Sequence, residues 1–80
     1  VERESPRGAR TVVRQIRTAV RRLYRHPASG RIVPEFGNPV YREVIAGRYR
    51  VVYRLEPDER LVRILMVVHG SRLLPPLPDE

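Results

Sequence analysis

Apolar residues recur every three or four positions along the first third of the chain, which is the period of an α-helix. Ser5 can act as the N-cap and Pro6 suits the first helical turn, whereas His26, Pro27 and Gly30 mark the end of the pattern. The spacing therefore predicts an amphipathic helix over residues 5–25. Its apolar stripe consists of Ala9, Val12, Val13, Ile16, Ala19, Val20, Leu23 and Tyr24.

After a loop rich in proline and glycine, the apolar residues begin to alternate with polar ones, which is typical of β-strands. Strands are predicted over residues 41–45, 48–55 and 61–68, and a short piece around Ile32 and Val33 is a candidate fourth. Ala46 and Gly47 are expected to form the first turn, and a Pro-Asp pair the second. The expected fold is a single α+β domain over residues 1–80, in which a three- to four-stranded antiparallel sheet within residues 41–69 packs against the helix. Residues 71–80 are expected to form an extended tail.

The alternation along each strand also predicts which side chains share a face of the sheet. One face of the strand over residues 48–55 carries Tyr49, Val51, Tyr53 and Leu55, and the other carries Arg48, Arg50, Val52 and Arg54. In the last strand, the wholly apolar set should face the helix, namely Val62, Ile64, Met66 and Val68. If Arg54 pairs with Arg63, a single open face carries Arg48, Arg50, Arg54, Arg63 and His69, although a register slip of one residue would scatter this set.

All sixteen basic residues are arginine, and their distribution is uneven. Residues 1–31 hold nine Arg against two Glu, a net charge of +7, whereas residues 32–80 hold seven Arg against seven acidic residues, a net charge of zero. Arginine binds phosphate and carboxylate well, so nucleic acid and acidic proteins are both candidate partners. The polar face of the helix is either simply solvated or the surface for such a partner, and it carries Arg7, Arg10, Arg14, Arg17 and Arg21.

Several classes of function are excluded by what the sequence lacks. Without cysteine there are no disulfides, thiolate metal sites or thiol nucleophiles, and His26 and His69 are too far apart to suggest a metal site. No apolar run approaches the length of a membrane span, so we expect a cytoplasmic protein without a cofactor and without membrane contact. A chain of 80 residues has only a small core, which favours a partner or a self-dimer.

The predicted open face suggests chemistry on phosphate. Arginine can hold a phosphate group, and His69 can act as a general acid or base, with Glu35 or Glu43 in the complementary role. Such a set suits metal-independent RNA cleavage, in which a base activates the 2′-hydroxyl and an acid protonates the leaving oxygen. His69 could equally make a structural hydrogen bond at the end of a strand, and a binding function without chemistry fits the same residues.

An ordered set of segments, within residues 5–74, resembles the RelE/ParE superfamily of toxins from type II toxin–antitoxin systems: SPRGAR, HPASGRIVPE, YREVIAGRYRVVYR and LVRILMVVHGSRLL. The resemblance implies a compact α+β domain encoded beside an antitoxin that wraps and silences it. Members of this superfamily usually begin with a strand and a helix before the SPRGAR segment. The sequence is therefore expected to lack both, which would fit a shortened or inactivated remnant.

The resemblance implies two alternative activities. RelE-like members cleave mRNA at the ribosome, and on their pattern the catalytic residues are Arg50, His69 and, as a looser match, Glu35. ParE-like members inhibit DNA gyrase, and the HG-x-R ending here is similar to theirs, with Gly70 where the RelE-like branch tends to have tyrosine. We expect mRNA cleavage first, with gyrase inhibition or a non-catalytic binding remnant as the alternatives. Further nucleic-acid contacts are expected from Arg48, Arg54, Arg63 and Arg72.

Overall fold

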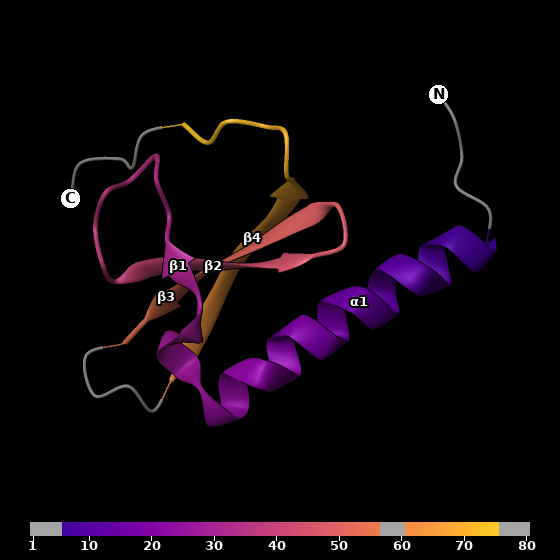
Figure 1. Ribbon diagram of the computed structural model, residues 1–80, viewed down its shortest axis with the longest axis horizontal. Helices are drawn as coiled ribbons and strands as arrows, with labels where there is room; N and C mark the ends of the chain where they lie inside the picture. Colours follow the sequence, from indigo (N-terminus) through magenta and orange to yellow (C-terminus); the bar gives the residue numbers. More distant parts are fainter. Residues whose placement is uncertain (1–5, 57–60, 76–80) are drawn as a thin grey trace.

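The computed structural model describes residues 6–56 and 61–75 (Figure 1). A long helix, α1 (Pro6–Arg25), is followed by a short 3₁₀ turn, η1 (Pro27–Ser29). Four strands come next: β1 (Arg31–Ile32), β2 (Tyr41–Ala46), β3 (Tyr49–Leu55) and β4 (Val62–His69). They form one antiparallel sheet in the order β1-β2-β3-β4, which confirms the predicted α+β class.

The local sequence signals place the ends of these elements well. α1 ends at Arg25, because Pro27 cannot continue the helical hydrogen-bond ladder, and His26 N–H donates to the carbonyl of Arg22 at 3.0 Å. β2 includes Ala46, so the turn to β3 consists of Gly47 and Arg48 rather than the predicted Ala46 and Gly47. The predicted N-cap and the predicted Pro-Asp turn lie outside the described residues.

Each face of the sheet carries its own apolar cluster. α1 covers one face, where buried side chains come from α1, β2 and β3: Ala19, Leu23, Val44, Ala46, Val51 and Tyr53. The opposite face is covered by the loop over residues 33–40 and by Leu74, and its buried cluster consists of Val33, Tyr41, Val52 and Leu74. The prediction of an open second face is therefore wrong, because the loop before β2 and the segment after β4 both fold over it.

A β-bulge in β4 changes which side chains face the helix. Arg54 pairs with Arg63, as expected, but Tyr53 pairs with Ile64 while Val52 pairs with Met66. Leu65 is the extra residue, and an extra residue reverses the alternation beyond it. The prediction that Met66 and Val68 face α1 is consequently wrong, since both pack in the cluster on the opposite face.

Much of β4 and part of the apolar stripe of α1 are exposed. Ile64, Leu65 and Val67 are 39–42% exposed, and Tyr24 is 83% exposed, so the predicted stripe is only partly packed. A groove of about 640 Å³ separates α1 from β4. We call it the α1–β4 groove, and its apolar lining is Val20, Leu23, Tyr24, Pro27, Leu61, Val62 and Ile64. Among the described residues, no helix has the length and apolar character required to cross a bilayer.

Candidate functional site

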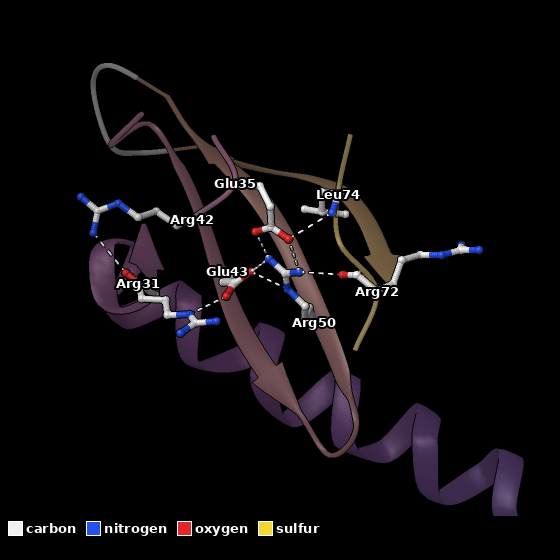
Figure 2. A network of polar contacts seen from close by, with 8 residues as sticks. Arg31, Glu35, Arg42, Glu43, Arg50, Arg72 and Leu74 are labelled. Carbon is white, nitrogen blue, oxygen red and sulfur yellow. Dashed lines mark hydrogen bonds and ion pairs between the residues drawn. The ribbon is translucent and has the colours of Figure 1, made fainter. Parts of the chain in front are cut away.

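Arg50 lies on β3 with its side chain on the face opposite α1, and protein acceptors surround it (Figure 2). Its Nε donates to Glu43 Oε1 at 2.7 Å, and its Nη1 donates to Glu35 Oε2 at 2.7 Å and to the carbonyl of Arg72 at 3.0 Å. Nη2 donates to Glu35 Oε1 at 2.8 Å and forms an ion pair with Glu43 Oε1 at 2.5 Å. A guanidinium group has five N–H donors, of which four make hydrogen bonds here, and the Nη2 atom that carries the fifth also forms the ion pair with Glu43.

The carboxylates of Glu35 and Glu43 each have a further hydrogen-bond partner besides Arg50. Glu43 is 1% exposed and also accepts a hydrogen bond from Arg31 Nε, and Glu35 Oε2 accepts one from Leu74 N–H at 3.0 Å. The hydrogen bonds that Arg50 donates to Glu35 lower the pKa of Glu35 to about 2. The same bonds raise the pKa of Arg50. We call this arrangement the Arg50 clasp, because it fastens the loop of Glu35 and the main chain after β4 to the sheet.

His69 lies at the end of β4 on the face that α1 covers. It pairs with Tyr49, and the two rings meet edge to face with centroids 5.7 Å apart. His69 Nδ1 accepts the N–H of Ser71 at 3.2 Å and lies 2.8 Å from Ser71 Oγ. Arg50 pairs with Val68 instead, so Arg50 and His69 lie on opposite faces. The predicted face shared by these residues does not form, because the bulge at Leu65 moves His69 to the other side.

The other predicted nucleic-acid contacts are dispersed. Arg54 and Arg63 lie at the far end of the β3–β4 hairpin, where the Nε atoms of both face Glu56 Oε2, at 3.9 and 3.2 Å. The carbonyl of Arg72 belongs to the clasp while its side chain points away from it in Figure 2. Arg48 is exposed in the β2–β3 turn, near His69. Of the predicted catalytic residues, the structure thus brings Arg50 and Glu35 together but separates both from His69.

Two further features involve α1. A groove of about 430 Å³, the arginine groove, is lined by Ala9, Arg10, Val13, Arg14, Arg17, Thr18 and Arg21. The side chain of Arg7, predicted for the same face, lies outside the described part. A pocket of about 600 Å³ separates the N-terminal half of α1 from the β2–β3 turn, and its polar lining includes Thr11, Gln15, Arg48, Tyr49 and His69.

Sequence reasoning missed this second pocket. Gln15 and Tyr49 carry no motif, and they come from segments that are far apart along the chain, so no spacing signal connects them. For the side chains within residues 6–56 and 61–75, no group of three or more His, Cys, Asp or Glu could hold a metal ion.

Comparison with known proteins agrees with this fold. The family model described as ParE toxin of type II toxin-antitoxin system, parDE, matches residues 1–74. No curated protein matches the chain, and neither does any solved structure. The helix followed by a four-stranded antiparallel sheet is also consistent with a RelE/ParE-like fold. Because the family model spans nearly the whole chain, the chain belongs to the ParE toxin family, within the RelE/ParE superfamily of type II toxin–antitoxin systems.

Proposed function

We propose that this toxin acts by binding its target rather than by cutting it, and that the target is DNA gyrase, as in ParE-like members of the superfamily. The observation that carries the proposal is that the Arg50 side chain is already bound within the protein, by four hydrogen bonds and by ion pairs with Glu35 and Glu43. RNA cleavage on the RelE-like pattern would need this arginine to hold the scissile phosphate. The clasp makes Arg50 a residue that positions the main chain instead.

The energetic argument supports the same choice. A phosphate that took the place of Glu35 or Glu43 at Arg50 would break a buried ion pair, and removing one partner from such a pair costs roughly 3–5 kcal/mol. Catalytic groups must also surround one reacting atom at a distance of about 3 Å. Arg50 and His69 leave the sheet on opposite faces and do not meet this condition together.

A cognate antitoxin is the partner that the family implies. Two surfaces favour an antitoxin segment that is acidic on one side and apolar on the other: the arginine groove, and the α1–β4 groove beside the exposed residues of β4. Such a segment would neutralise the arginines and cover the apolar strand. A second copy of this basic chain would cover the strand without neutralising the charge. A cytoplasmic location accompanies this proposal, because gyrase and ribosomes are both found there.

mRNA cleavage is the second candidate, and one observation favours it. The His69 ring is exposed, and its Nδ1 is held by Ser71, an arrangement that would suit a general acid or base. In this candidate the predicted catalytic roles of Arg50 and Glu35 require the clasp to open on the ribosome. Arg48 has an exposed side chain and lines the same pocket as His69, so it could then contact the phosphate.

Two assays on the purified full chain separate the candidates. Gyrase is assayed for supercoiling of relaxed plasmid, and a translated mRNA is examined for cuts by primer extension. We expect supercoiling to be blocked while the mRNA stays intact, and His69→Ala to inhibit gyrase as the unaltered chain does. Codon-aligned mRNA cuts, lost in His69→Ala, would overturn the proposal in favour of RNA cleavage. A folded chain that affects neither reaction would support the binding remnant.

A further inference from the structure

We propose that the pocket between the N-terminal half of α1 and the β2–β3 turn binds a phosphate group, through Arg48, Tyr49, His69 and Gln15. The pocket lies on the face opposite the Arg50 clasp and shares no residue with it. Its volume of about 600 Å³ is within the usual range for sites of small ligands. The inference holds whichever target the toxin has.

The backbone of the hairpin brings the polar groups together. Gly47 has a φ of 62°, which allows the tight turn, and a Cβ at this position would overlap the Gln15 side chain. Gly70 N–H donates to the carbonyl of Arg48 at 2.7 Å, which fastens the end of β4 to the same turn. The turn, α1 and the end of β4 therefore meet at one place, although they are distant in the sequence.

The electrostatics of the pocket favour an anion. The acidic residues that the structure describes are Glu35, Glu43 and Glu56, and each of them pairs with arginine elsewhere. Within residues 6–56 and 61–75, Arg48 makes no ion pair, so its guanidinium group is available to bind an oxyanion in a bidentate manner. A cation would find no carboxylate in this lining.

The other residues of the lining add groups that can donate hydrogen bonds. His69 Nδ1 contacts Ser71, whereas Nε2 has no partner in the described part of the chain, so Nε2 can donate to an oxyanion when it carries a proton. The edge-to-face contact with Tyr49 restrains the same ring. Gln15 and Tyr49 also line the pocket, and a side-chain amide and a phenol hydroxyl can each donate a hydrogen bond. Oxygen atoms that only accept hydrogen bonds, such as those of phosphate, complement this set.

A phosphate group could come from a nucleic-acid backbone or from a small nucleotide, and a titration can distinguish the two. The full chain, labelled with ¹⁵N, is titrated with inorganic phosphate, a nucleoside monophosphate and a short single-stranded oligonucleotide. We expect the largest shifts at the His69 ring and at the amides of Gly47, Arg48 and Tyr49 with every probe. Tighter binding of the oligonucleotide identifies a nucleic-acid backbone as the ligand, and equal binding identifies a nucleotide.

The variants Arg48→Gln and His69→Asn should each weaken binding about 10-fold, because each removes hydrogen bonds to a charged ligand. Arg25→Gln removes the same charge as Arg48→Gln at the other end of α1 and serves as the matched control. Both arginines are exposed, so the folded spectrum should persist in each variant. The proposal is overturned if phosphate shifts no pocket residue, or if Arg25→Gln weakens binding as much as Arg48→Gln.

Discussion

Arg50 and His69 lie on opposite faces of the sheet, because Arg50 pairs with Val68 whereas His69 pairs with Tyr49. Arg50 is only 4% exposed and is bound by two carboxylates, while His69 is exposed on the side of α1. The two residues that the family resemblance joins in one catalytic set are thus divided by the sheet. This division places Arg50 in the clasp and His69 beside α1, and the first two predictions below test the structural contribution of the clasp.

Replacing Arg50 by glutamine should destabilise the fold strongly. The change leaves Glu35 and Glu43 without their main counter-charge, and the expected loss in the free energy of unfolding is about 3–5 kcal/mol. Urea denaturation followed by circular dichroism measures this loss. The matched control is Arg25→Gln at an exposed position, where we expect a change of about 0.5 kcal/mol or less. Equal urea midpoints for Arg50→Gln and Arg25→Gln would show that the clasp contributes little to the free energy of unfolding.

The clasp should also make stability depend on pH in the acid range. The folded-state pKa of Glu35 is about 2, against an ordinary pKa of 4.5, so the unfolded chain binds more protons between these values. The contribution of Glu35 to stability is complete above pH 4.5 and is lost as the pH falls toward 2. Urea midpoints measured across this range should fall less steeply for Glu35→Gln than for the unaltered chain. Parallel curves for the two proteins would argue against the lowered pKa.

Tyr53 should be a second point of structural sensitivity. Its hydroxyl donates to the carbonyl of Pro27 at 2.7 Å and accepts the N–H of Gly30 at 3.0 Å, in a site where the side chain is fully buried. Tyr53→Phe removes both bonds and leaves their partners unsatisfied, so we expect a loss of about 1–3 kcal/mol in the free energy of unfolding. Tyr49→Phe, at a partly exposed position, is the control in the same denaturation series.

The same tyrosine predicts a loss of stability in alkali. Burial raises the pKa of Tyr53 above its usual value of 10.0, so this residue stays protonated in the fold when tyrosines of the unfolded chain ionise. The folded state then binds more protons than the unfolded state, and stability falls as the pH rises above about 10. An ultraviolet titration should show one of the four tyrosines ionising late. The late step should be missing in Tyr53→Phe, and its persistence there would refute the assignment.

The exposed strand β4 should promote association of the free toxin. β4 lies at one edge of the sheet in the described strand order, and Leu65 and Val67 on it are about two-fifths exposed. We expect self-association that rises with concentration and decreases in Val67→Lys, since a lysine on an edge strand opposes pairing. Light scattering after size-exclusion chromatography measures the mass. Ser71→Lys adds the same charge just after the strand and serves as the control. An equal decrease in self-association in this variant would show that net charge, rather than strand pairing, is responsible.

The elements of the fold were predictable because their signals are local. The period of the apolar residues identified α1 and the three longer strands, and Pro27 set the end of the helix within a residue or two. The pairing of Arg54 with Arg63 was only an assumption about the register, and the structure contains it. The bulge at Leu65 had no such signal, since a run of apolar residues reads the same with or without one extra residue.

By itself, the sequence determined the helix, the strands, the concentration of positive charge in its first third, and the resemblance to a toxin family. The tertiary structure decided which of these residues meet. The loop of Glu35 and the main chain beyond β4 fold over the second face, because Arg50, once desolvated there, needs acceptors for all its donors. The bulge then turns His69 toward Arg48, Tyr49 and α1. Local sequence patterns specify the helix and the strands. Burial and strand register specify which side chains meet, because burial and register depend on groups that are distant along the chain.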